Sequence, residues 1–174
     1  MIKSTKYKNT TVRYKVEGKG KPVVLLHGYL ESLDIWNEFS NELLPGFRIV
    51  SIDLLGHGKT GNVAGVHTME MMAEAVNQVL EKERIDKCVM FGHSMGGYTT
   101  LAFLEKYPEK LSGFSLFHSH PFADKPATIE KRNREIRLIE QGKKNLVCLT
   151  NTTNFFALAN IKKFDEELTK IKQT

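Results

Sequence analysis

The sequence predicts an α/β protein in which a mostly parallel sheet is flanked by helices. Short, continuously apolar segments rich in β-branched residues alternate with segments of helical periodicity, and glycines and prolines fall between them. Strands and helices that alternate in this way are joined by right-handed crossovers, which place helices on both faces of the sheet. The 174 residues suffice for one domain with a hydrophobic core.

The apolar segments define the expected strands. The buried strands are expected at residues 23–26, 47–52, 88–91 and 111–117. Residues 11–16 alternate apolar and polar side chains, as a half-exposed strand does, and residues 4–8 are the expected hairpin partner.

Helical periodicity fills the gaps between these strands. The helices are expected at residues 33–44, 68–83 and 95–107. The pattern changes after Phe122, because no strand signal appears beyond residue 118. The later helices are expected at residues 126–142, 146–149 and 161–171, with a polar break at 150–154. We therefore expect a sheet-containing part over residues 1–122 and a helical part over residues 123–174.

One motif points to chemistry. Residues 92–96 read Gly-His-Ser-Met-Gly and lie between the strand predicted at 88–91 and the helix predicted at 95–107. This is the G-x-S-x-G nucleophile elbow in its required strand–turn–helix context. A side chain at Gly92 or Gly96 would crowd so tight a turn. The alternative is that Ser94 only ends a strand in a glycine-rich turn.

Two further loops accompany the Ser94 motif. His27-Gly28-Tyr29 follows the strand at 23–26, and a loop that runs from Asp53 to Gly58 through His57 follows the strand at 47–52. All three loops lie at the carboxyl ends of parallel strands, where open α/β sheets bind ligands. Together they resemble the α/β-hydrolase superfamily, in its single-domain esterase-like branch with a helical lid. The resemblance covers residues 1 to about 122, and the lid at 123–174 only by position and composition.

The resemblance implies a role for three residues. Ser94 matches the nucleophile, and the backbone N–H groups of Tyr29 and Met95 match the two oxyanion donors. The implied activity is hydrolysis of a small carboxylic ester or a related acyl compound, with no cofactor and no metal. Lyases, haloperoxidases and C–C hydrolases on the same fold remain alternatives, because fold does not fix function.

Other polar residues near these loops are weaker candidates. The expected pocket residues are His27, Gly28, His93, His118 and His120. His118 and His120 could share a face at a strand end and meet a metal, but without a nearby carboxylate or cysteine ligand a pocket wall is preferred. Asp124 is a candidate for the acid of the triad. Asp53 is expected to bind loop backbone.

The resemblance also implies that part of the catalytic machinery is missing. The superfamily places its acid and then its histidine after the nucleophile, yet no histidine follows His120. We expect a chain truncated after the lid, without the general base and the C-terminal core strands. The outer edge of the strand at 111–117 would then be bare, and a second copy or a C-terminal piece is expected to cover it. An incompetent fragment or a ligand-binding module is the non-enzymatic alternative.

Composition limits the partners. The net charge is +5, but lysines and arginines are interleaved with acidic residues and no nucleic-acid motif occurs, so a nucleic-acid partner is not expected. No apolar stretch approaches the roughly 20 residues that span a bilayer, and no secretory signal is recognised. The two cysteines, Cys88 and Cys148, are expected to be reduced thiols in a cytoplasmic protein.

Overall fold

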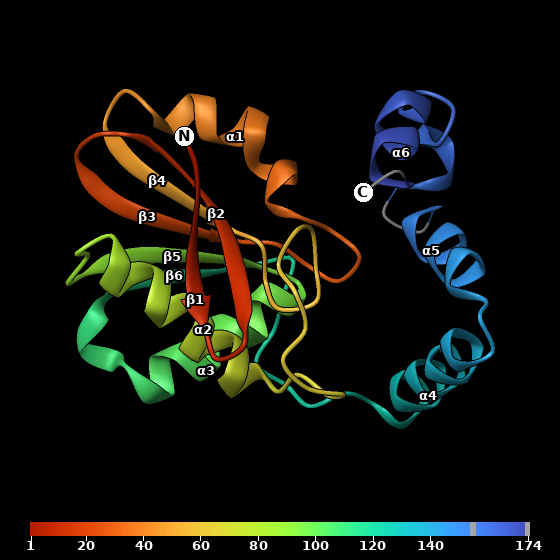
Figure 1. Ribbon diagram of the computed structural model, residues 1–174. Helices are drawn as coiled ribbons and strands as arrows, with labels where there is room; N and C mark the ends of the chain where they lie inside the picture. The colour runs from red at the N-terminus through yellow and green to blue at the C-terminus, as the bar shows by residue number, and fades with distance from the viewer. Residues whose placement is uncertain (154–155, 173–174) are drawn as a thin grey trace. The chain divides into compact units, whose positions relative to one another are not determined.

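The computed structural model describes residues 1–153 and 156–172, and their strands form one six-stranded sheet (Figure 1). The strands are β1 (Ile2–Tyr7), β2 (Thr10–Gly18), β3 (Lys21–Leu26), β4 (Phe47–Ile52), β5 (Cys88–His93) and β6 (Leu111–Phe117). Their order is β1-β2-β4-β3-β5-β6. β2 pairs antiparallel with both β1 and β4, whereas β4, β3, β5 and β6 pair parallel with one another in that order. The predicted α/β fold with a mostly parallel sheet is confirmed.

The described chain forms two compact units, Met1–Pro121 and Phe122–Thr174. The first unit contains the sheet with η1 (Leu33–Trp36), α1 (Asn37–Leu43), α2 (Met69–Lys82), α3 (Met95–Lys106) and η2 (Pro108–Lys110). The second contains α4 (Pro126–Glu140), α5 (Lys144–Thr153), η3 (Leu158–Asn160) and α6 (Asp165–Lys172). Over the described ranges, no helix has the length and apolar character needed to cross a bilayer.

Alternate side chains of the central strands pack on opposite faces of the sheet. Val24 and Leu26 of β3 belong to the larger core, which is shared with α2 and α3. Val23 and Leu25 pack with Trp36, which precedes α1. The sheet is therefore covered by α2 and α3 on one face and by α1 on the other (Figure 1). Successive side chains of a strand point to opposite faces, so apolar residues at successive positions bury both faces of the parallel sheet.

Three expected helix boundaries were wrong. The single helix expected at 33–44 is a 3₁₀ turn that continues directly into α1; the Ser32 side chain accepts a hydrogen bond from Asp34 N and caps the start of that turn. The polar break expected at 150–154 falls partly inside α5, since Asn151 Nδ2 and Thr152 Oγ1 donate to carbonyls one helical turn earlier. Asn154 lies outside the described residues. The last helix begins at Asp165 instead of 161.

The two edges of the sheet differ. β6 forms one edge, and Phe114 and Phe117 on it are 43% and 44% exposed. Within the described ranges no strand pairs with its outer side. The expectation that a second copy or a further segment covers this edge stays a prediction.

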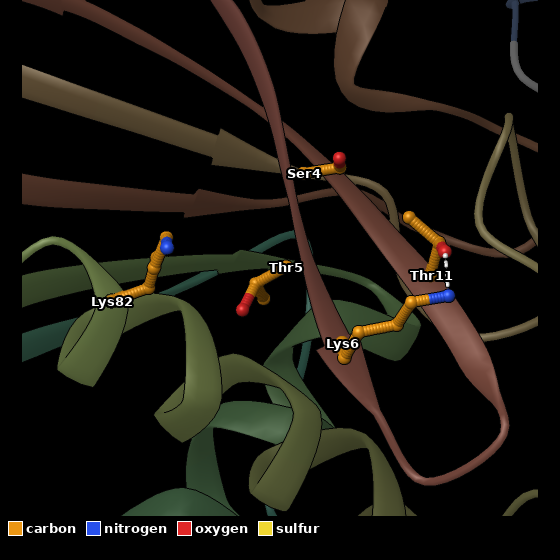
Figure 2. Close-up of a pocket in the computed structure, with 5 residues that line it drawn as sticks. All are labelled: Ser4, Thr5, Lys6, Thr11 and Lys82. Atoms are coloured by element: carbon orange, nitrogen blue, oxygen red, sulfur yellow. Dashed lines mark hydrogen bonds between the residues drawn. The ribbon is translucent and has the colours of Figure 1, made fainter.

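The hairpin β1–β2 forms the other edge and carries an open hollow. The hollow is lined by Ser4, Thr5, Lys6, Thr11 and Lys82, as Figure 2 shows. Three strands, β2, β4 and β3, separate β1 from β5. At a strand spacing of about 4.8 Å, the hollow is therefore remote from the loop that follows β5.

Candidate active site

Ser94 lies between the end of β5 and the start of α3 and is partly exposed. Its backbone angles are φ 47° and ψ −112°, in the left-handed half of conformational space that L-residues rarely occupy. The turn leaves no room for side chains around it. A Cβ atom on Gly92 would lie 2.3 Å from the Gly96 carbonyl oxygen, and one on Gly96 would lie 2.6 Å from the Leu26 carbonyl oxygen. Glycine is therefore required at both positions, as the motif predicts.

The carbonyl of Ser94 is fixed from two sides. Ser119 Oγ donates to it at 2.8 Å and Gly97 N at 2.9 Å. In a planar trans peptide the carbonyl and the following N–H point in opposite directions. Fixing the Ser94 carbonyl therefore also fixes the direction of the Met95 N–H, the candidate oxyanion donor. Ser119 was not among the predicted site residues, and only its position directly after β6 could have singled it out.

In the loop after β3, a side chain likewise donates a hydrogen bond to a backbone carbonyl. The Gly28 carbonyl accepts a hydrogen bond from His27 Nδ1 at 2.8 Å, while His27 Nε2 accepts one from Leu54 N at 3.0 Å. The Leu54 N–H can only donate, so Nε2 is the unprotonated nitrogen and Nδ1 carries the hydrogen. Full burial lowers the pKa of His27 to about 4, which keeps the ring neutral near pH 7. His27 thus sets the direction of the Tyr29 N–H and is not placed to transfer a proton.

These two loops are in contact. A Cβ atom on Gly28 would lie 3.2 Å from Ser94 Cβ and 3.0 Å from His93 Nδ1. The sequence motif alone predicted both loops at the same edge of the sheet, and the structure brings Gly28 against the serine. The Glu31, His93 and Ser94 side chains around it leave no room for a side chain at Gly28.

Glu31 also belongs to this cluster and was missed by the sequence reasoning. Its carboxylate is 7% exposed, and Oε2 accepts hydrogen bonds from Gly28 N at 2.6 Å and from His93 Nδ1 at 2.9 Å. An acidic residue three positions after the glycine of the loop is the signal that could have drawn attention to it.

Asp53 organises the loop after β4. Its Oδ1 accepts from Leu33 N at 2.8 Å, and its Oδ2 accepts from Lys59 N at 2.9 Å and from Arg13 Nη1 at 3.0 Å. The expectation that Asp53 binds loop backbone is confirmed. His57 donates through Nδ1 to the Leu55 carbonyl, and burial lowers its pKa.

The remaining candidates lie after β6. His118 is exposed, and its ring centroid is 6.2 Å from that of His93. The His120 ring lies 6.0 Å from the Tyr98 ring. Asp124 belongs to the second unit, where its carboxylate binds Arg132 Nε at 2.6 Å. In the part of the chain that the structure describes, no three His, Cys, Asp or Glu side chains form a group that could hold a metal ion.

Known proteins share this sequence pattern and this fold. The profile of the alpha/beta hydrolase fold family matches residues 21–138. A protein of Mycobacterium phage D29 named as a non-heme haloperoxidase is 31% identical over 96 residues, 55% of this chain and 34% of that protein. A Bacillus subtilis protein named as a 2-succinyl-6-hydroxy-2,4-cyclohexadiene-1-carboxylate synthase is 33% identical over 117 residues, 63% of this chain and 42% of that protein.

A solved structure extends the likeness to nearly the whole chain. The thermophilic esterase from Thermogutta terrifontis superposes with a TM-score of 0.89 at 27% identity, over 99% of this chain and 65% of the esterase. The chain thus spans about two thirds of that structure and less than half the length of the two sequence relatives. With more than half of its residues matched by the family profile, the chain belongs to the alpha/beta hydrolase fold family.

Proposed function

We propose that this chain carries the nucleophile and the oxyanion donors of a serine hydrolase that acts on a small carboxylic ester or a related acyl compound. Ser94 Oγ attacks the carbonyl carbon, and the N–H groups of Tyr29 and Met95 bind the oxygen that becomes negative. Collapse of this intermediate expels the alcohol and leaves the acyl group on Ser94, and water then releases it as the acid. The observation that carries the proposal is a partly exposed serine in a left-handed turn, with the Gly28 loop against it.

The proposed chemistry needs a general base, because a serine hydroxyl is almost fully protonated at neutral pH. Four of the six histidines have ring nitrogens bonded to other groups: His27 and His57 as described, His67 to Val63 N, and His93 to Glu31. Only for His27 are both ring nitrogens shown bonded to backbone groups among the described contacts, so we propose that His27 is not the base. One bonded nitrogen, as at His57, His67 and His93, does not by itself exclude a base. A serine that lacks its general base retains only the residual catalysis of the oxyanion donors and of binding, roughly 10³–10⁴-fold over water.

The relatives support the hydrolase proposal and one alternative. The thermophilic esterase is the structural neighbour that carries the hydrolase proposal. The relatives named as a haloperoxidase and as a carboxylate synthase favour the alternative of a lyase or a haloperoxidase on the same elbow. Because both use the same serine, covalent labelling tests the nucleophile, and release of the alcohol from an ester tests the hydrolase.

The test is covalent labelling of the purified chain with a fluorophosphonate, followed by intact-mass and peptide analysis. We expect one adduct, on Ser94, and no adduct in Ser94→Ala. Ser112→Ala is the matched control, since Ser112 is exposed and bonds only backbone in the structure. Release of p-nitrophenol from the acetate ester on the same sample then reports turnover. An intact relative that carries the C-terminal region and stays unlabelled at the serine matching Ser94 would contradict the proposal, and tight ligand binding without labelling would support a binding module instead.

A further inference from the structure

We infer that Glu31 is a positioning residue: its buried carboxylate locks the loop after β3 to the nucleophile elbow and thereby sets where the Tyr29 N–H lies. The inference rests on the proposed function, because the position of that N–H matters only if an oxyanion forms beside Ser94. Glu31 itself is not placed to touch substrate.

The contacts join the two halves of the site through one oxygen atom. Glu31 Oε2 accepts from Gly28 N at 2.6 Å, in the loop after β3, and from His93 Nδ1 at 2.9 Å, on the residue before Ser94. A carboxylate offers only acceptor sites, so Nδ1 of His93 carries the hydrogen. The bond to His93 spans 62 residues of sequence and the bond to Gly28 spans three, so together they connect the segments that carry the two proposed oxyanion donors.

Gly28 is held at both of its polar groups as a result. Glu31 binds its N–H, and His27 binds its carbonyl. Gly28 has no side chain to restrain it, and glycine has the largest conformational freedom of any residue. Without the carboxylate, the His27–Gly28 peptide could rotate, and only the His27 bond to the Gly28 carbonyl, of these two, would still hold the Gly28–Tyr29 peptide. The Tyr29 N–H would then sample a range of directions.

Stability alone does not account for a carboxylate in this place. At 7% exposure its desolvation is costly, and apolar residues of similar volume often stabilise a buried site as well as charged ones do. The neighbouring backbone is anchored independently, since Ser32 caps η1 and Leu33 N donates to Asp53. What only Glu31 supplies is a shared acceptor between the two loops.

Three variants test this role. Glu31→Leu removes the acceptor, whereas Glu31→Gln keeps one oxygen that can accept both bonds. Glu83→Leu is the matched control, because Glu83 is also a buried, multiply bonded carboxylate but lies at the other end of the parallel strands. Each variant is labelled with the fluorophosphonate, and the rate constant of bond formation is separated from the reversible binding constant, per folded molecule.

We expect Glu31→Leu to slow bond formation roughly 10–100-fold with binding unchanged within about twofold, a smaller effect than the 10²–10³-fold loss on deleting an oxyanion donor. Glu31→Gln should stay within about threefold of wild type. Labelling of Glu31→Leu at the wild-type rate overturns the inference. An equal loss in Glu83→Leu overturns it as well, because the loss would then follow stability.

A spectroscopic readout decides the inference even if the wild-type chain does not react, a result that bears on the proposed function alone. In nitrogen-15 NMR spectra we expect the His93 ring to carry its hydrogen on Nδ1, with slow exchange of the Gly28 amide. Glu31→Leu should speed that exchange at least tenfold and shift the Tyr29 amide resonance, and Glu31→Gln should preserve both. A Tyr29 resonance that does not move in Glu31→Leu overturns the inference.

Discussion

Two buried glutamates lie at opposite ends of the parallel strands, and they gather different kinds of donor. Glu31 follows β3 at its carboxyl end and binds a backbone N–H and a histidine beside Ser94. Glu83 follows α2 near the start of β4 and binds the Tyr14 hydroxyl at 2.7 Å, Lys3 at 3.0 Å, and Arg48. At the carboxyl end of the strands, Glu31 binds a loop N–H and a histidine ring. At the other end, Glu83 binds side chains of three strands.

The difference has a physical basis in the partners. The Glu83 partners come from β1, β2 and β4, so one carboxylate holds three strands to the end of α2. Burial raises the pKa of the Glu83 carboxyl, but the hydrogen bonds from Tyr14 and Lys3 and the charge of Arg48 outweigh it, and the pKa is lowered. The negative form is therefore stabilised by folding, and variants at the two ends should separate stability from reactivity.

The largest expected effect is a pH dependence that arises at the site end. The His27 pKa is lowered from 6.5 to about 4 in the folded chain. The unfolded chain therefore binds more protons between these values, and the free energy of unfolding falls as pH drops from 6.5 towards 4, by at most about 3 kcal/mol. Chemical denaturation across this range should show the slope in wild type and a smaller slope in His27→Asn, where His57, whose pKa burial also lowers, still contributes.

Glu83→Leu is the control for this pH dependence. Its lowered pKa contributes stability that is present above the ordinary carboxyl value of 4.5 and is lost as pH falls below it. A Glu83→Leu chain should therefore keep the slope between 6.5 and 4 that belongs to His27. If Glu83→Leu removes that slope, the two ends are not independent.

The next effect is the stability loss of Glu83→Leu itself. Removing one partner of a buried ion pair costs about 3–5 kcal/mol, and the partly exposed Lys3 and Arg48 side chains reduce this to about 2 kcal/mol. The measurement is the denaturant midpoint at pH 7. Labelling of Ser94 per folded molecule should not change, and a parallel loss of labelling would break the distinction between the two ends.

The smallest effect on stability is expected for Ser119→Ala. The variant removes one of the two bonds to the Ser94 carbonyl, which should lower the free energy of unfolding by about 1 kcal/mol. The loosened peptide lets the Met95 N–H turn, so labelling of Ser94 should slow roughly tenfold, a fraction of the loss on deleting a donor. Unchanged labelling with lowered stability would show that Ser119 acts on folding alone.

The sequence predicted the elements wherever a local pattern defines them. The strands at 47–52 and 111–117 were recognised at their observed limits, because each is an apolar segment with breakers around it. Within 33–44 the first turn is 3₁₀ and Asn37–Leu43 is α-helical, a difference in helix type that apolar periodicity does not encode. The polar residues after 149 continue α5, because their side chains bond to the helix itself.

The candidate site was inferred from local patterns in the same way. Ser94, Gly28 and Tyr29 stand in short motifs whose spacing can be recognised in one dimension. Glu31 and Ser119 are not part of these motifs, because Glu31 joins its own loop to the His93 ring and Ser119 binds the Ser94 carbonyl from the segment after β6. Their partners follow from strand order and register, which no local periodicity encodes.

The positive φ of Ser94 reduces the stability of the folded chain. A residue other than glycine at φ 47° carries strain on the order of 1–3 kcal/mol, and glycine at position 94 would relieve most of it. A chain selected for stability alone would have glycine there. Among the described residues, Lys8, Leu30, Arg84 and His118 also have positive φ. Under the proposed function, Ser94 differs from these because its hydroxyl is the reacting group, and the less stable residue is kept for that hydroxyl.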